Sequence, residues 1–108
     1  MAMKCNIDID QGSDFEAIFD IKDDNNQYVD LNGYTGAAQM RKYYTSNTAY
    51  DFQVSIDVAG IVTLSMNSAN TVTINAGRYV YDCEVTSSSN VTSRILEGIV
   101  TVTPGVTR

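Results

Sequence analysis

The sequence predicts a single all-β domain, a sandwich or barrel of about seven strands. Apolar and polar residues alternate along several short segments, which is typical of strands with one buried face. Turn-forming residues separate these segments at roughly 8–12-residue intervals. No helical pattern lasts long enough for the crossovers of parallel βαβ units. Because 108 residues suit one domain, we assign residues 1–108 to it.

The first two strands are predicted on either side of a short glycine-containing break. Residues 3–10 alternate between apolar and polar side chains, with lysine, asparagine and aspartates on the polar face. Residues 11–13 interrupt this pattern, and residues 15–21 resume it with Ile18 as an apolar outsider. Residues 23–26 are predicted to turn, because Asp and Asn side chains bond to nearby backbone and tolerate left-handed conformations.

The middle of the chain predicts three more strands. Asn32-Gly33 is a tight-turn signal that precedes a third strand over residues 36–41, where small residues on both faces indicate close packing. Residues 52–56 and 62–66 are the fourth and fifth strands. Residues 57–60, which join them, are few enough for a hairpin.

The last third of the chain contains the clearest strand. Residues 67–75 are predicted to form a loop or one helical turn, with Val72 and Ile74 pointing inward. Residues 91–103 carry apolar groups on both faces, so we expect part of this strand to be covered on both sides or to bend between two sheets. The clearest strand lies between these two segments. Its predicted inward residues are Tyr79, Tyr81, Cys83 and Val85.

The composition disfavours several classes of partner. Seven Lys and Arg face thirteen Asp and Glu, a formal charge of −6, which works against binding to nucleic acid or anionic membranes. No apolar run approaches the roughly 18 residues of a spanning helix. No secretion signal is recognisable, so we expect synthesis in a cytoplasm. The acidic residues concentrate in the first 30 positions, as Asp8, Asp10, Asp14, Glu16, Asp20, Asp23, Asp24 and Asp30.

The residue types argue against an enzyme. The chain has no histidine, which removes Ser-His-Asp and Cys-His catalysis and most zinc sites. Asp8 with Asp10, and Asp82 with Glu84, form carboxylate pairs, but each pair lies on an exposed strand face where both groups should stay ionised. We therefore predict no catalytic residue and no cofactor site.

A calcium site is also not predicted. Asp8, Asp10 and Gly12 have the spacing that begins an oxygen-ligand loop. The twelfth position of an EF-hand loop needs a glutamate, and here it is Phe19. Strand alternation already accounts for both aspartates.

The two cysteines, Cys5 and Cys83, both occupy predicted inward positions. Since nothing indicates an oxidising compartment, we expect buried free thiols, with one disulfide as the alternative.

Tyrosines mark the candidate interface. Tyr43, Tyr44 and Tyr50 cluster around the loop between the third and fourth strands, with Arg41 beside them. Tyrosine combines contact area with a polar group and is enriched at protein interfaces. We predict that these four residues form a binding surface; the alternative is that one or two of the tyrosines cap the edge of the core.

The run from Gly77 to Cys83 resembles a strand of immunoglobulin-like domains. It predicts an immunoglobulin-like antiparallel β-sandwich, with Tyr81 as a tyrosine corner whose hydroxyl ties down the preceding crossover. Two departures matter. The third strand has no core tryptophan, and Cys5 lies on the first strand, so the usual inter-sheet disulfide is not expected.

A second resemblance covers most of the chain and is carried by five motifs. They are Gln11-Gly12-Ser13-Asp14-Phe15, Val29-Asp30-Leu31-Asn32-Gly33-Tyr34-Thr35, Ala38-Gln39-Met40-Arg41, Ala76-Gly77-Arg78-Tyr79 and Leu96-Glu97-Gly98. These motifs resemble small β-sandwich domains of tailed-bacteriophage virions, namely the N-terminal domain of baseplate upper proteins and its standalone relatives. The resemblance implies a non-enzymatic virion component, present in many copies or as an oligomer and docked to other virion proteins of the capsid, neck, tail or baseplate. It implies assembly into the virion after synthesis in the host cytoplasm.

The runner-up is a carbohydrate- or receptor-binding module of an adhesin. Sugar sites usually combine an aromatic platform with polar groups. Tyr43, Tyr44, Tyr50 and Arg41 offer such a combination, although the chain has no tryptophan.

Overall fold

The computed structural model describes residues 3–106 and confirms the all-β class. Within these residues the chain forms eight strands and one short helix, where about seven strands were predicted. The elements are β1 (Met3–Lys4), β2 (Ile7–Asp10), β3 (Phe15–Asp20), β4 (Thr35–Arg41), β5 (Ala49–Asp57), β6 (Ile61–Met66), α1 (Ser68–Thr71), β7 (Gly77–Thr86) and β8 (Thr92–Thr103).

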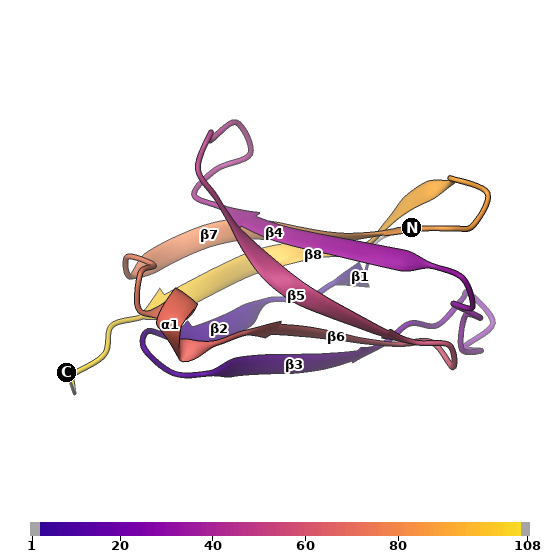
Figure 1. The fold of residues 1–108 in the computed structure, drawn as a ribbon, viewed down its shortest axis with the longest axis horizontal. Coiled ribbons are helices and arrows are strands. Elements are labelled where there is room, and N and C mark those ends of the chain that lie inside the picture. The colour runs from indigo at the N-terminus through magenta and orange to yellow at the C-terminus, as the bar shows by residue number, and fades with distance from the viewer. Residues whose placement is uncertain (1–2, 107–108) are drawn as a thin grey trace.

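The strands follow one continuous path that curls into two layers (Figure 1). Their order is β1-β8-β7-β4-β5-β6-β3, and β2 also pairs with β8. β5 belongs to both layers, because residues 49–52 pair with β4 and residues 53–57 pair with β6. We call β4, β7 and β8 the upper layer and β3 and β6 the lower layer. The predicted hairpin between the fourth and fifth strands is confirmed, with Gly60 at a φ of 96°.

Most strand pairs of the sheet are antiparallel, but those at one edge are parallel. β1 and β2 run parallel to β8, while the remaining strand pairs are antiparallel. Parallel pairing is possible there because nearly the whole chain lies between these strands, so no hairpin dictates their direction. The all-β class is established, and the immunoglobulin-like assignment stays a prediction.

The N-terminal segment was predicted as one strand, but it is interrupted at Cys5 and Asn6. At this point Gly98 of β8 lies so close that a Cβ on it would overlap the Cys5 carbonyl oxygen. The Asn6 side chain replaces a backbone partner, since its Oδ1 accepts a hydrogen bond from the Ile99 N–H at 3.1 Å. The Cys5 N–H donates to the Glu97 carbonyl at 2.9 Å. The break is therefore held by specific contacts on both sides.

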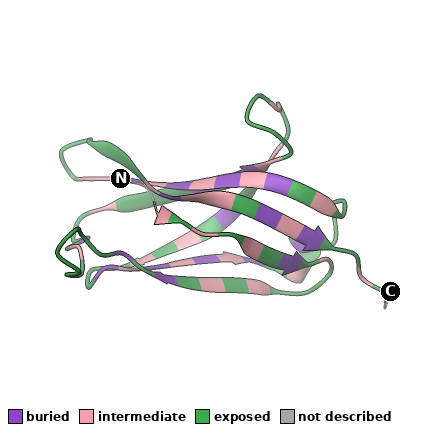
Figure 2. Cartoon of the chain, turned by 180° about the vertical axis from the view of Figure 1, so that it is seen from behind, coloured by how far each residue is buried: buried purple, intermediate pink, exposed green. Residues whose placement is uncertain are grey.

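The core lies between the two layers, and Figure 2 shows buried and exposed residues alternating along the strands. The four predicted inward residues of β7 are all buried. Ile74 is buried as predicted, but the prediction for Val72 is wrong, since 57% of it is exposed. The α1 turn places Thr71 inward instead, where its hydroxyl donates to the Ser13 carbonyl at 2.8 Å and accepts from the Gly12 N–H at 3.1 Å.

The position of Ile95 next to the inward Leu96 has a cause that was not predicted. The register with β7 shifts after Cys83, so that Leu96 lies opposite Cys83 but Arg94 lies opposite Glu84. The extra residue, Ile95, is a β-bulge, which moves the inward positions from one set of alternate residues to the other. The strand is not covered on both sides, because 41% of Ile99 is exposed on the outer face.

We predict that Gly98→Ala detaches the N-terminal segment from β8. Because the added methyl group meets backbone and not a flexible side chain, it should lower the free energy of unfolding by about 1–3 kcal/mol. Urea denaturation measures this change, and hydrogen exchange should show lost protection first at the Cys5 amide. Unchanged stability together with unchanged protection would contradict the close contact.

Candidate docking surface

The loop of residues 42–48 rises from the outer face of the upper layer between β4 and β5 (Figure 1). Arg41 braces it, because its guanidinium donates to the Ser46 carbonyl at 2.6 Å and to Gln39 Oε1 at 3.0 Å. Within the loop, the Ser46 N–H donates to the Tyr43 carbonyl at 3.0 Å, and the Thr48 N–H donates to Ser46 Oγ at 3.2 Å. The loop is therefore fixed by its own hydrogen bonds.

The four predicted interface residues take different positions around this loop. Tyr43 is 60% exposed and Tyr44 is 78% exposed, so both rings present contact area to solvent. Tyr50 is half-buried and meets Tyr79 edge-on, with 6.1 Å between ring centroids. It caps the edge of the core, which was the alternative interpretation. Arg41 acts as the brace described above.

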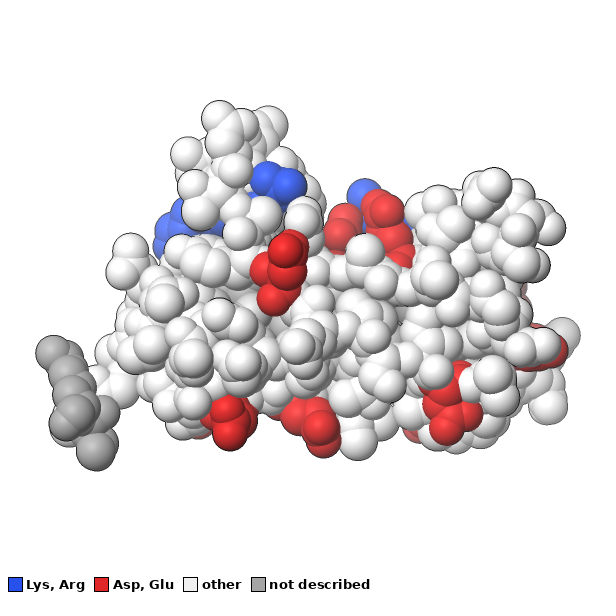
Figure 3. Space-filling view, in the orientation of Figure 1, with Lys and Arg blue, Asp and Glu red and all other residues white. Residues whose placement is uncertain are grey.

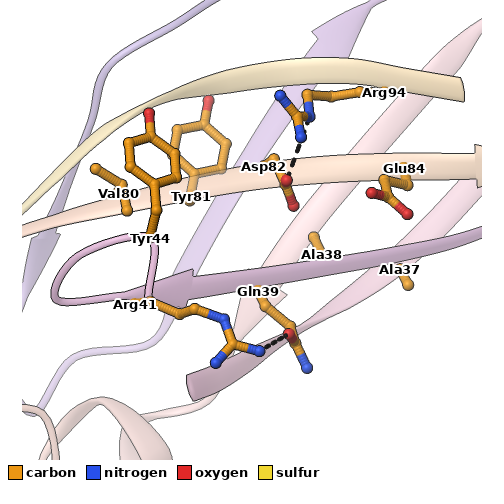
Figure 4. A pocket seen from close by; sticks show the side chains of 10 residues that line it. All are labelled: Ala37, Ala38, Gln39, Arg41, Tyr44, Val80, Tyr81, Asp82, Glu84 and Arg94. Carbon is orange, nitrogen blue, oxygen red and sulfur yellow. Dashed lines mark hydrogen bonds and ion pairs between the residues drawn. The ribbon is translucent and has the colours of Figure 1, made fainter. Parts of the chain in front are cut away.

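One hollow lies on the outer face of the upper layer, beside Tyr44 (Figure 4). Its volume is about 340 Å³. On its floor Arg94 pairs with Asp82 at 3.3 Å, and the same guanidinium reaches Glu97 at 3.3 Å. The hollow is shallow and both polar and apolar, and its lining residues are Ala37, Ala38, Gln39, Arg41, Tyr44, Val80, Tyr81, Asp82, Glu84 and Arg94.

A second hollow, of about 440 Å³, lies on the other side of the loop. Tyr43 and Tyr50 line it together with Tyr79 and the base of the loop. The Lys42 ammonium group lies 4.9 Å from the centre of the Tyr79 ring. Gly77 makes room for it, since a Cβ there would lie 2.7 Å from Lys42 Nζ. Arg41 and Tyr44 thus line the first hollow, whereas Tyr43 and Tyr50 line the second.

The tyrosine corner was assigned to the wrong residue. The Tyr79 hydroxyl, not that of Tyr81, ties down the preceding segment by donating to the Asn75 carbonyl at 2.6 Å. The Tyr81 hydroxyl donates to the Cys5 carbonyl at 2.6 Å, and so fixes the N-terminal segment. Burial raises the pKa of both phenols. Tyr81 remains structural, but its hydroxyl joins β7 to the N-terminal segment.

Both cysteines are free thiols, Cys83 buried and Cys5 half-buried. β8 lies between β1, which Cys5 follows, and β7, which carries Cys83. Strands two apart in a sheet are separated by about 9–10 Å. A disulfide needs Cα atoms within about 7 Å, so bridging these residues would require the backbone to move.

The carboxylate pairs noted in the sequence lie on outer faces. Asp10 accepts a hydrogen bond from the Thr103 hydroxyl at 2.7 Å, and Asp82 pairs with Arg94. Residues 3–106 contain no group of three or more metal-ligating side chains. Over the same residues, no helix is long and apolar enough to span a membrane.

No known protein-family model matches the sequence, and no curated protein is significantly similar to it.

The Cys83 thiol predicts how stability depends on pH. Burial, with smaller contributions from Asp82 and Glu84, raises the pKa of this thiol from 9.0 to about 12. The folded state therefore keeps a proton that the unfolded state loses above pH 9. Unfolding free energy should be unaffected by this group below pH 9 and should fall above it by up to about 1.4 kcal/mol per pH unit.

Urea denaturation at pH 9 and pH 10 tests this dependence before the tyrosines contribute strongly. Cys83→Ala should flatten the fall over this interval, whatever its effect on stability at pH 7. An equal fall in the variant and the original protein would show that another group is responsible.

Proposed function

We propose that this protein is a non-enzymatic structural component of a bacteriophage virion that acts by docking to other virion proteins. The observation that carries the docking role is the pair of exposed tyrosines, Tyr43 and Tyr44, on a loop held in place by Arg41. Tyrosine and arginine are enriched among the residues that dominate binding energy at interfaces. A fixed loop loses little conformational freedom when it binds.

The surroundings of the loop support docking more than chemistry. Tyr79, Tyr81 and Cys83 have raised pKa values, but all three are core side chains. The two tyrosine hydroxyls make structural hydrogen bonds, and the Cys83 thiol is buried. The nearby acid Asp82 is occupied by Arg94. Both hollows are open depressions beside the loop, which suits the side chains of a protein partner.

The virion location rests on the resemblance of the sequence motifs. Several of these motifs have structural roles that hold the loop and its sheet in place. Asn32-Gly33 makes the turn before β4, with Gly33 at a φ of 79°. Met40 is fully buried and Arg41 braces the loop. Gly77 admits the Lys42 side chain.

We predict that Tyr43→Ser combined with Tyr44→Ser removes the protein from assembled particles. Both side chains are exposed, so the unfolding free energy should change by less than about 0.5 kcal/mol. Incorporation into virions of the encoding phage should fall about tenfold or more, because two central contacts are lost. Quantitative mass spectrometry of purified particles measures it.

Tyr28→Ser is the matched control, since Tyr28 is 52% exposed but lies away from the loop. It should leave incorporation unchanged. Particles that assemble normally without the protein, and never contain it, would contradict the proposed function.

A carbohydrate-binding role is the second candidate, and the second hollow favours it. There the rings of Tyr43 and Tyr50 lie beside Lys42 and Asn75, which offer hydrogen-bond donors and acceptors. The platform differs from the predicted one, because Tyr44 and Arg41 line the other hollow. Binding on a glycan array that is lost in Tyr43→Ser but kept in Tyr44→Ser would support this role, and an array without any binding would end it.

A further inference from the structure

The outer face of the lower layer carries acidic side chains along its strands, with the exposed Lys22 just beyond the end of β3. The buried positions of β3 and β6 alternate with residues that point away from the core, and residues 53–57 of β5 continue this surface. Ile18 is 65% exposed at its edge. We call this surface the acidic face; its charged residues within these strands are acidic, and it includes Glu16, Ile18, Asp20, Ser55, Asp57 and Thr63.

The base of the raised loop has the opposite charge. Arg41 and Lys42 lie there, and Arg78 is close because Arg41 pairs with Val80, two residues along β7. We call these three residues the basic corner. Both ion pairs found within residues 3–106 belong to Arg94, so no carboxylate in that part of the chain forms an ion pair with the basic corner. Asp51 is linked to Arg41 only through Gln39, which donates to Asp51 and accepts from Arg41. Figure 3 shows blue atoms around the loop base and red atoms along the lower edge of the molecule, with further red atoms below and beside the loop.

We propose that a second copy of this chain docks here, the basic corner and loop of one copy contacting the acidic face of the next. This inference rests on the proposed docking function and names its partner. Lys42 and Arg78 would meet Glu16 and Asp20, while the exposed tyrosines cover Ile18 and its neighbours. The two surfaces match in both respects, since each combines unpaired charge with exposed apolar area.

The positions of the basic corner and the acidic face determine the symmetry of the contact between copies. The two surfaces differ and lie on opposite layers, so the contact is head-to-tail. Such contacts form a ring if the rotation between copies closes, and a filament if it does not. Two copies that met through like faces would bring charges of the same sign together, which favours the head-to-tail contact over a symmetric one.

Sedimentation velocity of the purified full chain, over a range of protein concentrations, tests the proposal. We expect concentration-dependent association that weakens as salt rises from about 0.05 M to about 0.5 M. Reversal of the basic corner, Lys42→Glu with Arg78→Glu, should raise the dissociation constant about tenfold or more. Reversal of the acidic face, Glu16→Lys with Asp20→Lys, should do the same. An equimolar mixture of the two variants should associate again, because each supplies the surface that the other can bind.

Lys4→Glu is a charge control, since it makes one of the two reversals on β1, outside both surfaces. It should leave association unchanged, and circular dichroism should show that every variant is folded. A chain that stays monomeric throughout, or association that survives both reversals, would overturn the head-to-tail contact. If incorporation into virions still depends on Tyr43 and Tyr44 in that case, the docking function stands and only its partner was misassigned.

Discussion

β5 is hydrogen-bonded to β4 along its first half and to β6 along its second, and this division shapes the whole molecule. A strand that leaves one neighbour for another must turn away from the first sheet, which curls the sheet around the core. Gly36 permits the departure, since a Cβ there would lie 2.6 Å from Val54. The same division leaves each layer with an uncovered outer face, and the loop before β5 projects from the upper one.

The edges of the curled sheet are protected in different ways. The N-terminal segment covers the edge of β8. Two hydrogen bonds between residues far apart in the sequence hold it, one from the Tyr81 hydroxyl and one to the Asn6 side chain. At the other end of the path, β3 exposes Glu16 and Asp20, and charges on an edge strand discourage uncontrolled pairing with other chains. Charge on β3 would therefore serve twice, against aggregation and, as we propose, for an ordered contact between copies.

Alternation alone could predict the strands, because each has one buried face, and it placed the inward residues of β7 correctly. It could not reveal the bulge at Ile95, since an extra residue changes the facing of a strand without leaving a turn signal. Nor could it choose between Tyr79 and Tyr81, which share a face and differ only in what their hydroxyls reach. The exposed pair Tyr43 and Tyr44 was predictable as a loop feature, whereas the basic corner was not, because Arg78 joins Arg41 only through the pairing of β7 with β4.

The proposed docking requires that protein cover the loop in the assembled particle. Hydroxyl-radical footprinting, read by mass spectrometry on intact virions and on the free protein, measures this directly. We expect Tyr43 and Tyr44 to be strongly protected in virions, while Tyr28, exposed to a similar extent in the isolated chain, keeps its reactivity. Equal labelling of all three tyrosines in both states would contradict docking through this loop.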